Sequence, residues 1–122
     1  MKDKHPITGH ATGLAAENFA ALLLRLKGYR ILARRYKTPV GEIDLIARRG
    51  RTIAFVEVKA RQTMDEALAA VTPAMQARIT RAAGYFLAGN PALAQLTLRF
   101  DLMAVRPPFY CRHLDNAWQG TS

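Results

Sequence analysis

Two short apolar segments that carry acidic residues constrain the fold of this chain more than any other feature of its sequence. Residues 41–46 are Gly-Glu-Ile-Asp-Leu-Ile, and residues 55–59 are Phe-Val-Glu-Val-Lys. Both are apolar enough for strands, and the basic connection 48–51 (Arg-Arg-Gly-Arg) is short enough for a hairpin turn. The sequence therefore predicts strands at 42–47 and 52–58 that pair as a hairpin.

The expected hairpin brings two carboxylates together. Because side chains alternate along a strand, Asp44 shares a face with Ile46, and Glu57 shares a face with Phe55 and Lys59. Asp44 and Glu57 can then lie side by side. Mg²⁺ prefers oxygen ligands and usually keeps several waters, so two carboxylates and a substrate phosphate are enough to hold it. Lys59 would reach the same cluster, where it could hold an attacking water or stabilise charge on a phosphate.

The same charges have an ordinary structural explanation. A Glu-Val-Lys triplet is common on exposed strands, and Asp44 could be the exposed partner of an arginine. However, both segments are apolar enough for central strands, where an exposed charged face is less expected. Asp44 and Glu57 would also repel each other across a hairpin without a cation. We therefore predict a metal site with these two carboxylates as ligands.

A third acid lies on the first expected helix. This helix runs from a Thr12 cap to about Lys27 and is followed by Gly28. The neighbours of Glu17 one turn later are two alanines and a leucine, and such a row lets a helix approach a sheet closely. Glu17 is therefore expected to point inward, although a single helix glutamate is more often solvated.

The remaining sequence predicts one α/β unit with a mixed sheet. Thr63 and Glu66 fit a capping box, and Pro73 suits the first turn of a further helix. The other expected elements are a strand at 29–36, a helix at 73–87, a strand at 96–105 and an edge strand at 109–114. The order is α-β-β-β-α-β, and a helix between two strands implies a parallel pair. We expect a single domain over 1–122, with a flexible arm at 1–11 and a C-terminal extension at 107–122.

The charge of the chain indicates a polyanionic partner. Lys and Arg total 18 against 9 for Asp and Glu, which gives a formal net charge of +9. A field of this sign attracts nucleic acid, although charge can also serve solubility alone. We expect DNA rather than RNA, with its backbone held by Arg34, Arg35, Lys37, Arg48, Arg49, Arg51 and Arg61.

Other functional classes find little support. No stretch is long enough for a transmembrane helix, and the N-terminus lacks the apolar core of a signal peptide, so no membrane partner is expected. The one cysteine, Cys111, excludes an internal disulfide framework and favours a reducing, cytoplasmic setting. His5, His10 and His113 show no metal-binding spacing.

Several segments together carry a family resemblance: 13–20, 28–29, 41–46, 55–61, 82–87 and 99–101. On these the chain resembles the PD-(D/E)xK nuclease superfamily, and within it the bacterial YraN-like family, which is similar to archaeal Holliday-junction resolvases. The resemblance implies a restriction-endonuclease-like domain. It further implies that Asp44 and Glu57 bind Mg²⁺ or Mn²⁺, that Lys59 is the catalytic lysine and that Glu17 completes the site. Two departures are Ile43, where the superfamily often has proline, and Met75, where related chains often carry a basic residue.

These observations predict a metal-dependent endonuclease that hydrolyses phosphodiester bonds in DNA, with branched DNA as one candidate substrate. The alternatives are a catalytically silent nucleic-acid-binding module with a nuclease fold, and a protein–protein adaptor. Symmetric cutting of branched DNA needs two active sites, so a homodimer is a candidate assembly. Its candidate surface is Pro107, Pro108, Phe109, Tyr110 and Trp118, which could equally cover the domain's own core.

Overall fold

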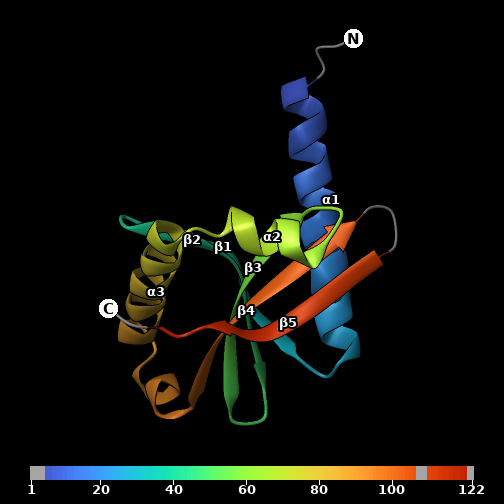
Figure 1. Cartoon of the computed structure of the whole chain (residues 1–122). Helices are drawn as coiled ribbons and strands as arrows, with labels where there is room; N and C mark the ends of the chain where they lie inside the picture. Colours follow the sequence, from blue (N-terminus) through green and yellow to red (C-terminus); the bar gives the residue numbers. More distant parts are fainter. Residues whose placement is uncertain (1–4, 107–109, 121–122) are drawn as a thin grey trace.

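A five-stranded sheet in the order β1-β2-β3-β4-β5 runs through the molecule, with helices on both of its faces (Figure 1). The computed structural model describes residues 5–106 and 110–120, with side chains from residue 13 onward. The elements are α1 (His5–Leu26), β1 (Arg30–Thr38), β2 (Gly41–Arg49), β3 (Thr52–Ala60), α2 (Met64–Ala70), α3 (Pro73–Ala88), a 3₁₀ turn η1 (Pro91–Gln95), β4 (Thr97–Arg106) and β5 (Tyr110–Trp118). The expected single α/β domain is confirmed.

The sheet is mixed, as predicted. β1, β2 and β3 pair antiparallel in chain order, β3 pairs parallel with β4, and β4 pairs antiparallel with β5. The parallel pair follows from the crossover through α2 and α3. β3, which carries Glu57 and Lys59, is therefore the middle strand of the sheet.

Apolar side chains form one core on each face. The α1-side core joins Ala16, Ala20 and Leu24 of α1 to strand residues such as Val56. The α3-side core joins Ile79, Ala82 and Phe86 of α3 to strand residues such as Ile43, Ile46 and Phe55. Ala16, Ala20 and Ala21 of α1 are at most 2% exposed, so this helix lies close to the sheet, as its sequence predicts.

Local signals in the sequence explain where α2 and α3 begin. Thr63 accepts a hydrogen bond from the Glu66 backbone, and the Glu66 side chain accepts one from the Thr63 backbone, which completes the predicted capping box. Thr72 caps α3, whose first residue is Pro73. Both helices thus satisfy part of their free N-terminal donors locally.

Two predicted boundaries are wrong. α1 begins at His5, so Thr12 lies inside the helix rather than at its cap, and residues 5–11 of the expected arm are helical. The predicted edge strand is longer than 109–114, because β5 runs to Trp118 along β4. The remainder of the arm, 1–4, lies outside the described residues, and so do Pro107, Pro108 and Phe109 of the candidate dimer surface.

Strict alternation along β2 is also wrong. Ile43 and Ile46 both pack in the α3-side core, whereas Leu45 packs in the α1-side core. The pairing partner of this stretch is irregular as well, since Arg35 in β1 has a left-handed φ of 51°. Asp44 lies within this twisted stretch, so its facing was not predictable from a regular two-residue period. In the described residues no helix is both long and apolar enough to cross a membrane.

Candidate functional site

The candidate site begins where β2 and β3 stop pairing. Their ladder extends from Arg49 opposite Thr52 to Leu45 opposite Val56. One residue further along β2, the acceptor is a side chain instead of a backbone carbonyl: Asp44 Oδ2 accepts a 2.8 Å hydrogen bond from the Val58 N–H. This bond fixes the Asp44 carboxylate at the point where the two strands separate.

Glu57 is the neighbour of Asp44 and is 8% exposed. Burial, and after it the nearby charge of Asp44, raise the pKa of Glu57 to about 8. Burial also raises the pKa of Asp44 above its ordinary value, although the hydrogen bond from Val58 opposes this. Two carboxyl groups that resist ionisation together form a site where a proton or a cation is favourable.

Lys59 supplies one positive charge to this pair. Its Nζ lies 3.3 Å from Glu57 Oε2, and both side chains are largely buried. Lys59 follows Glu57 by two residues on β3, so strand alternation brings the two groups to the same face. The ammonium group lowers the pKa of Glu57, but burial outweighs it.

Glu17 reaches the same region from α1. It is 5% exposed, and it lines a cavity of about 360 Å³ together with Asp44, Arg35 and Lys37. Its Oε1 lies 3.0 Å from Arg34 Nη2 and 3.3 Å from Arg35 Nε. The predicted inward direction of Glu17 is therefore observed, but its charge is already balanced by arginines.

The structure thus brings together the four residues singled out from the sequence. Glu17 and Asp44 share a cavity, Asp44 neighbours Glu57, and Glu57 contacts Lys59. Within residues 5–106 and 110–120, no group of three or more His, Cys, Asp and Glu side chains is arranged to hold a metal ion. The donor set that fits a divalent cation here is the carboxylate pair of Asp44 and Glu57, which is the set predicted from the sequence.

Six of the seven basic residues expected to hold nucleic acid fall into two groups, and Arg61 lies apart from them. Arg34, Arg35 and Lys37 lie on β1 beside the cavity. Arg48, Arg49 and Arg51 lie at the opposite end of the β2–β3 hairpin, where Arg48 donates to the Gly50 carbonyl and Arg49 to the Lys27 carbonyl. Arg61 is exposed just after β3. Only the β1 group adjoins the carboxylates.

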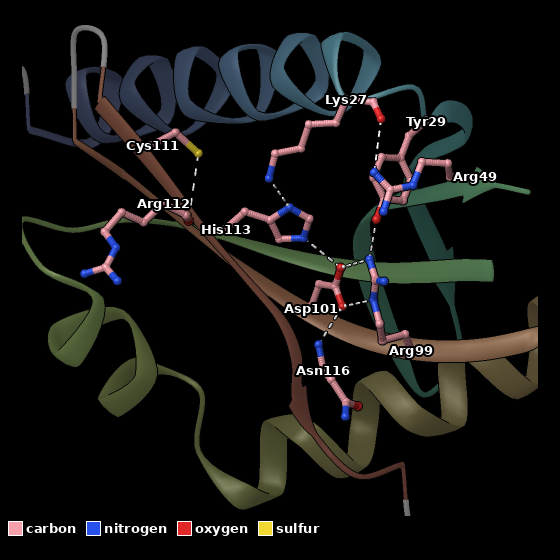
Figure 2. A network of polar contacts seen from close by, with 9 residues as sticks. All are labelled: Lys27, Tyr29, Arg49, Arg99, Asp101, Cys111, Arg112, His113 and Asn116. Atoms are coloured by element: carbon pink, nitrogen blue, oxygen red, sulfur yellow. Dashed lines mark hydrogen bonds and ion pairs between the residues drawn. The ribbon is translucent and has the colours of Figure 1, made fainter.

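A second buried acid, Asp101 on β4, was not predicted as a site residue. Its carboxylate accepts two 2.8 Å bonds from Arg99, one of 2.7 Å from His113 and one of 3.0 Å from the Asn116 backbone (Figure 2). Burial alone would raise the pKa of Asp101, but the bonds from His113 and Arg99 hold it below its ordinary value. The signal available in the sequence was an acid inside the apolar run 100–105.

The Asp101 network extends to the end of α1. Arg99 also donates to the Tyr29 hydroxyl, and Lys27 Nζ lies 2.8 Å from His113 Nδ1 (Figure 2). A lysine ammonium has no acceptor, so His113 Nδ1 accepts and its Nε2–H donates to Asp101. Every oxygen of Asp101 is therefore bonded, and the network joins β4, β5 and the α1–β1 connection.

The sequence comparisons place the chain. Residues 16–105 match the sequence model of the family described as "Uncharacterised protein family UPF0102". The chain belongs to this family. A UPF0102 protein of Parvibaculum lavamentivorans is 53% identical over 118 residues, covering 94% of this chain and 89% of the relative. Relatives from Methylorubrum extorquens and Rhodopseudomonas palustris (strain HaA2) are 56% and 50% identical, over 90% and 98% of this UPF0102 chain and 86% and 98% of their own lengths.

The region that matches the UPF0102 family contains both acid clusters. Glu17, Asp44, Glu57 and Lys59 lie within residues 16–105, as does Asp101. His113, which bonds Asp101 from β5, lies beyond that range.

Proposed function

We propose that this UPF0102 chain is a metal-dependent endonuclease that hydrolyses phosphodiester bonds in DNA. The observation that carries the proposal is the pair of half-buried Asp44 and buried Glu57, whose pKa values are raised, next to Lys59. A protein does not readily bury two adjacent carboxyl groups without a cation or a proton between them. The resemblance to PD-(D/E)xK nucleases, and to YraN-like chains among them, supports the same assignment of roles.

In this proposal Asp44 and Glu57 hold Mg²⁺ or Mn²⁺. When bound, such a metal ion neutralises charge on the phosphate and makes a bound water easier to deprotonate. Lys59 holds the attacking water or stabilises the charge that develops on the phosphate oxygens. Glu17 acts as a further acid once DNA phosphates compete for Arg34 and Arg35, which now balance it. The Val58 N–H keeps the Asp44 carboxylate oriented throughout.

The charge of the molecule favours nucleic acid as the substrate. The formal net charge is +9. Three cations of β1 lie beside the candidate carboxylates: Arg34, Arg35 and Lys37. A phosphodiester backbone that follows these cations would bring one phosphate to Asp44 and Glu57. Branched DNA remains the candidate structure within this class, and a homodimer the candidate assembly for cutting it. On the surface proposed for dimer contact, Tyr110 is 40% exposed, but Trp118 is buried in its own core.

A catalytically silent binding module is the second candidate, and one observation favours it. Glu17 is paired with two arginines, and the described residues include no group of three or more His, Cys, Asp and Glu side chains arranged to hold a metal ion. A chain that binds DNA through β1 without cleaving it would retain the same basic surface.

The experiment that separates the two candidates compares cleavage with binding. The full chain is incubated with labelled branched, duplex and single-stranded DNA, with Mg²⁺, with Mn²⁺ and with EDTA. We expect metal-dependent cleavage, and we expect Asp44→Asn to abolish it. The control is Asp115→Asn, which changes an exposed aspartate on β5 and should leave cleavage unchanged. Cleavage that persists in Asp44→Asn or Lys59→Ala protein would contradict the assignment. Binding of every substrate without cleavage would establish the silent module.

A further inference from the structure

A second cavity lies on the α3 side of the sheet. It has a volume of about 300 Å³, and its walls come from α3, from β3 and β4, and from the end of the chain at Asn116–Gly120. The stretch that follows β5 lies next to α3 in Figure 1. The candidate metal site belongs to a different cavity, lined from the α1 side.

Three aromatic rings form one wall of this α3-side cavity. Phe55 stacks on Phe100 at a centroid distance of 5.4 Å, and Phe100 stacks on Trp118 at 5.5 Å, with interplanar angles of 27° and 25°. Exposure increases along the stack from 0% at Phe55 to 9% at Trp118. Phe100 has a ring stacked on each of its faces, so Trp118, at the end of the stack, is the ring with one face outside it. A further planar ring would stack on that face of Trp118.

The polar groups of the cavity select a neutral ligand with a hydrogen-bond acceptor. All of its described lining side chains are uncharged, in a chain with a net charge of +9. Thr80, Asn116 and Gln119 offer polar groups at its edge. The Trp118 indole Nε1 is buried and has no hydrogen-bond partner among the described residues, which leaves one donor unpaired beside the cavity. An unpaired buried donor is unfavourable, so an acceptor that reaches it would be held.

Gly84 keeps part of the cavity open. It lies in the middle of α3, where glycine disfavours a helix relative to alanine, yet a Cβ at this position would meet no atom within 4 Å. Packing within the domain therefore does not require a glycine here. Its absence of a side chain adds free volume to the cavity that it lines.

We propose that the α3-side cavity binds a single nucleobase. A base is planar and neutral, it carries ring acceptors, and the volume lies at the small end of the roughly 300–1,000 Å³ found for ligand sites. The inference rests on the proposed function in one respect, since a nucleic-acid strand is the expected source of the base. A free nucleoside presents the same chemistry, and the test below distinguishes the two sources.

Trp118 is the only tryptophan of the chain, so its fluorescence reports on this cavity alone. The full chain is titrated with adenosine, with a single-stranded oligonucleotide and with an abasic strand of equal length and charge. We expect the base-bearing strand to change Trp118 emission at a concentration roughly tenfold or more below the abasic strand. Adenosine acting at the same concentration as the strand would identify free nucleosides as the source. Equal responses to base-bearing and abasic strands, or no response to any probe, would overturn the proposal.

Two variants test the cavity without touching the carboxylates. Gly84→Leu adds a bulky side chain at a helix position that lines the cavity, with open space and better helix propensity, so the fold should be retained. Trp118→Phe keeps a ring but removes the unpaired donor. Both should lose the preference for base-bearing over abasic labelled strands, measured by fluorescence anisotropy, whereas Gly84→Ala should keep most of it. An unchanged preference in Gly84→Leu would refute the cavity site. If Gly84→Leu loses the base preference but keeps metal-dependent cleavage, the cavity is separate from the proposed nuclease site.

Discussion

Two buried acid clusters lie on the same sheet, and they differ in how far their charges are satisfied. Asp101 is fully buried and accepts bonds from Arg99, His113 and the Asn116 backbone, which lower its pKa. Asp44 and Glu57 face each other with one backbone donor and one lysine, and their pKa values are raised. Burial of an acid is therefore not itself a sign of function. A candidate site is distinguished by carboxylate oxygens that lack hydrogen-bond or ion-pair partners in the folded protein.

The largest expected effect is on stability at Asp101. Asp101→Asn removes the charge that Arg99 and His113 contact, and loss of one partner of a buried ion pair typically destabilises by roughly 3–5 kcal/mol. Asp44→Asn should leave the free energy of unfolding unchanged or raise it, because it relieves repulsion with Glu57. Urea denaturation of both variants measures the difference, with the exposed Asp115→Asn as control. Equal losses at Asp101 and Asp44 would remove the distinction between the clusters.

The next effect is stabilisation by metal ions. If Asp44 and Glu57 form a preformed site, Mn²⁺ at a hundred times its Kd should raise the free energy of unfolding by about 2.7 kcal/mol. Glu57→Gln should abolish most of the corresponding rise in Tm, measured by calorimetry. Glu42→Gln, an exposed change on the same cavity wall, should keep it. A rise in Tm that survives in Glu57→Gln would assign the metal to other residues.

The two clusters should also respond to pH in opposite directions. The folded pKa of Glu57, about 8, lies above its ordinary value of 4.5, so the folded state keeps a proton that the unfolded state loses. Its contribution to stability is present below pH 4.5 and is lost as pH rises toward 8, by at most about 1.4 kcal/mol per pH unit. The pKa of Asp101 is lowered in the folded state, so Asp101 stabilises the fold at pH values above its ordinary pKa of 3.8. This stabilisation is lost as the pH falls below that value.

Glu57→Gln should therefore flatten the pH dependence of the unfolding free energy between pH 4.5 and 8. Asp101→Asn should flatten it only below pH 4. The measurement is chemical denaturation across the pH range at constant ionic strength. A Glu57→Gln profile parallel to that of the unmodified chain over pH 4.5–8 would show that folding does not raise the pKa of Glu57.

The smallest expected effect concerns DNA affinity. Lys37 lines the cavity that contains Asp44, whereas Arg112 is exposed on β5 and points away from the Asp101 network (Figure 2). Lys37→Ala should remove about one phosphate contact and reduce the slope of log affinity against log salt by about 0.9 for duplex DNA. Arg112→Ala should leave the slope unchanged. Anisotropy at several salt concentrations measures both, and equal slopes in the two variants would contradict a DNA path along β1.

Much of the fold was predictable from local signals. The hairpin turn at 48–51, the capping box at Thr63 and the crossover that makes β3 and β4 parallel are encoded by short stretches of sequence. The hairpin register brings Asp44 next to Glu57 along the strands, but the irregular backbone around Asp44 decides the face that its side chain takes. What could not be predicted depends on contacts between distant strands. The partner of Asp101 is fixed by a β4–β5 register that shifts between Phe100 and Leu102, and the arginine partners of Glu17 depend on the left-handed backbone of Arg35.

Because the Val58 N–H donates to the Asp44 carboxylate, this amide of the central strand is sensitive to changes at the site. Most amides of a sheet donate to a backbone carbonyl, whose charge is constant. The Val58 amide donates to a group whose charge changes when a proton or a cation arrives. Its nuclear magnetic resonance frequency and its hydrogen-exchange rate should therefore change when a proton or a cation binds at Asp44. No attached label and no substitution is needed to detect this.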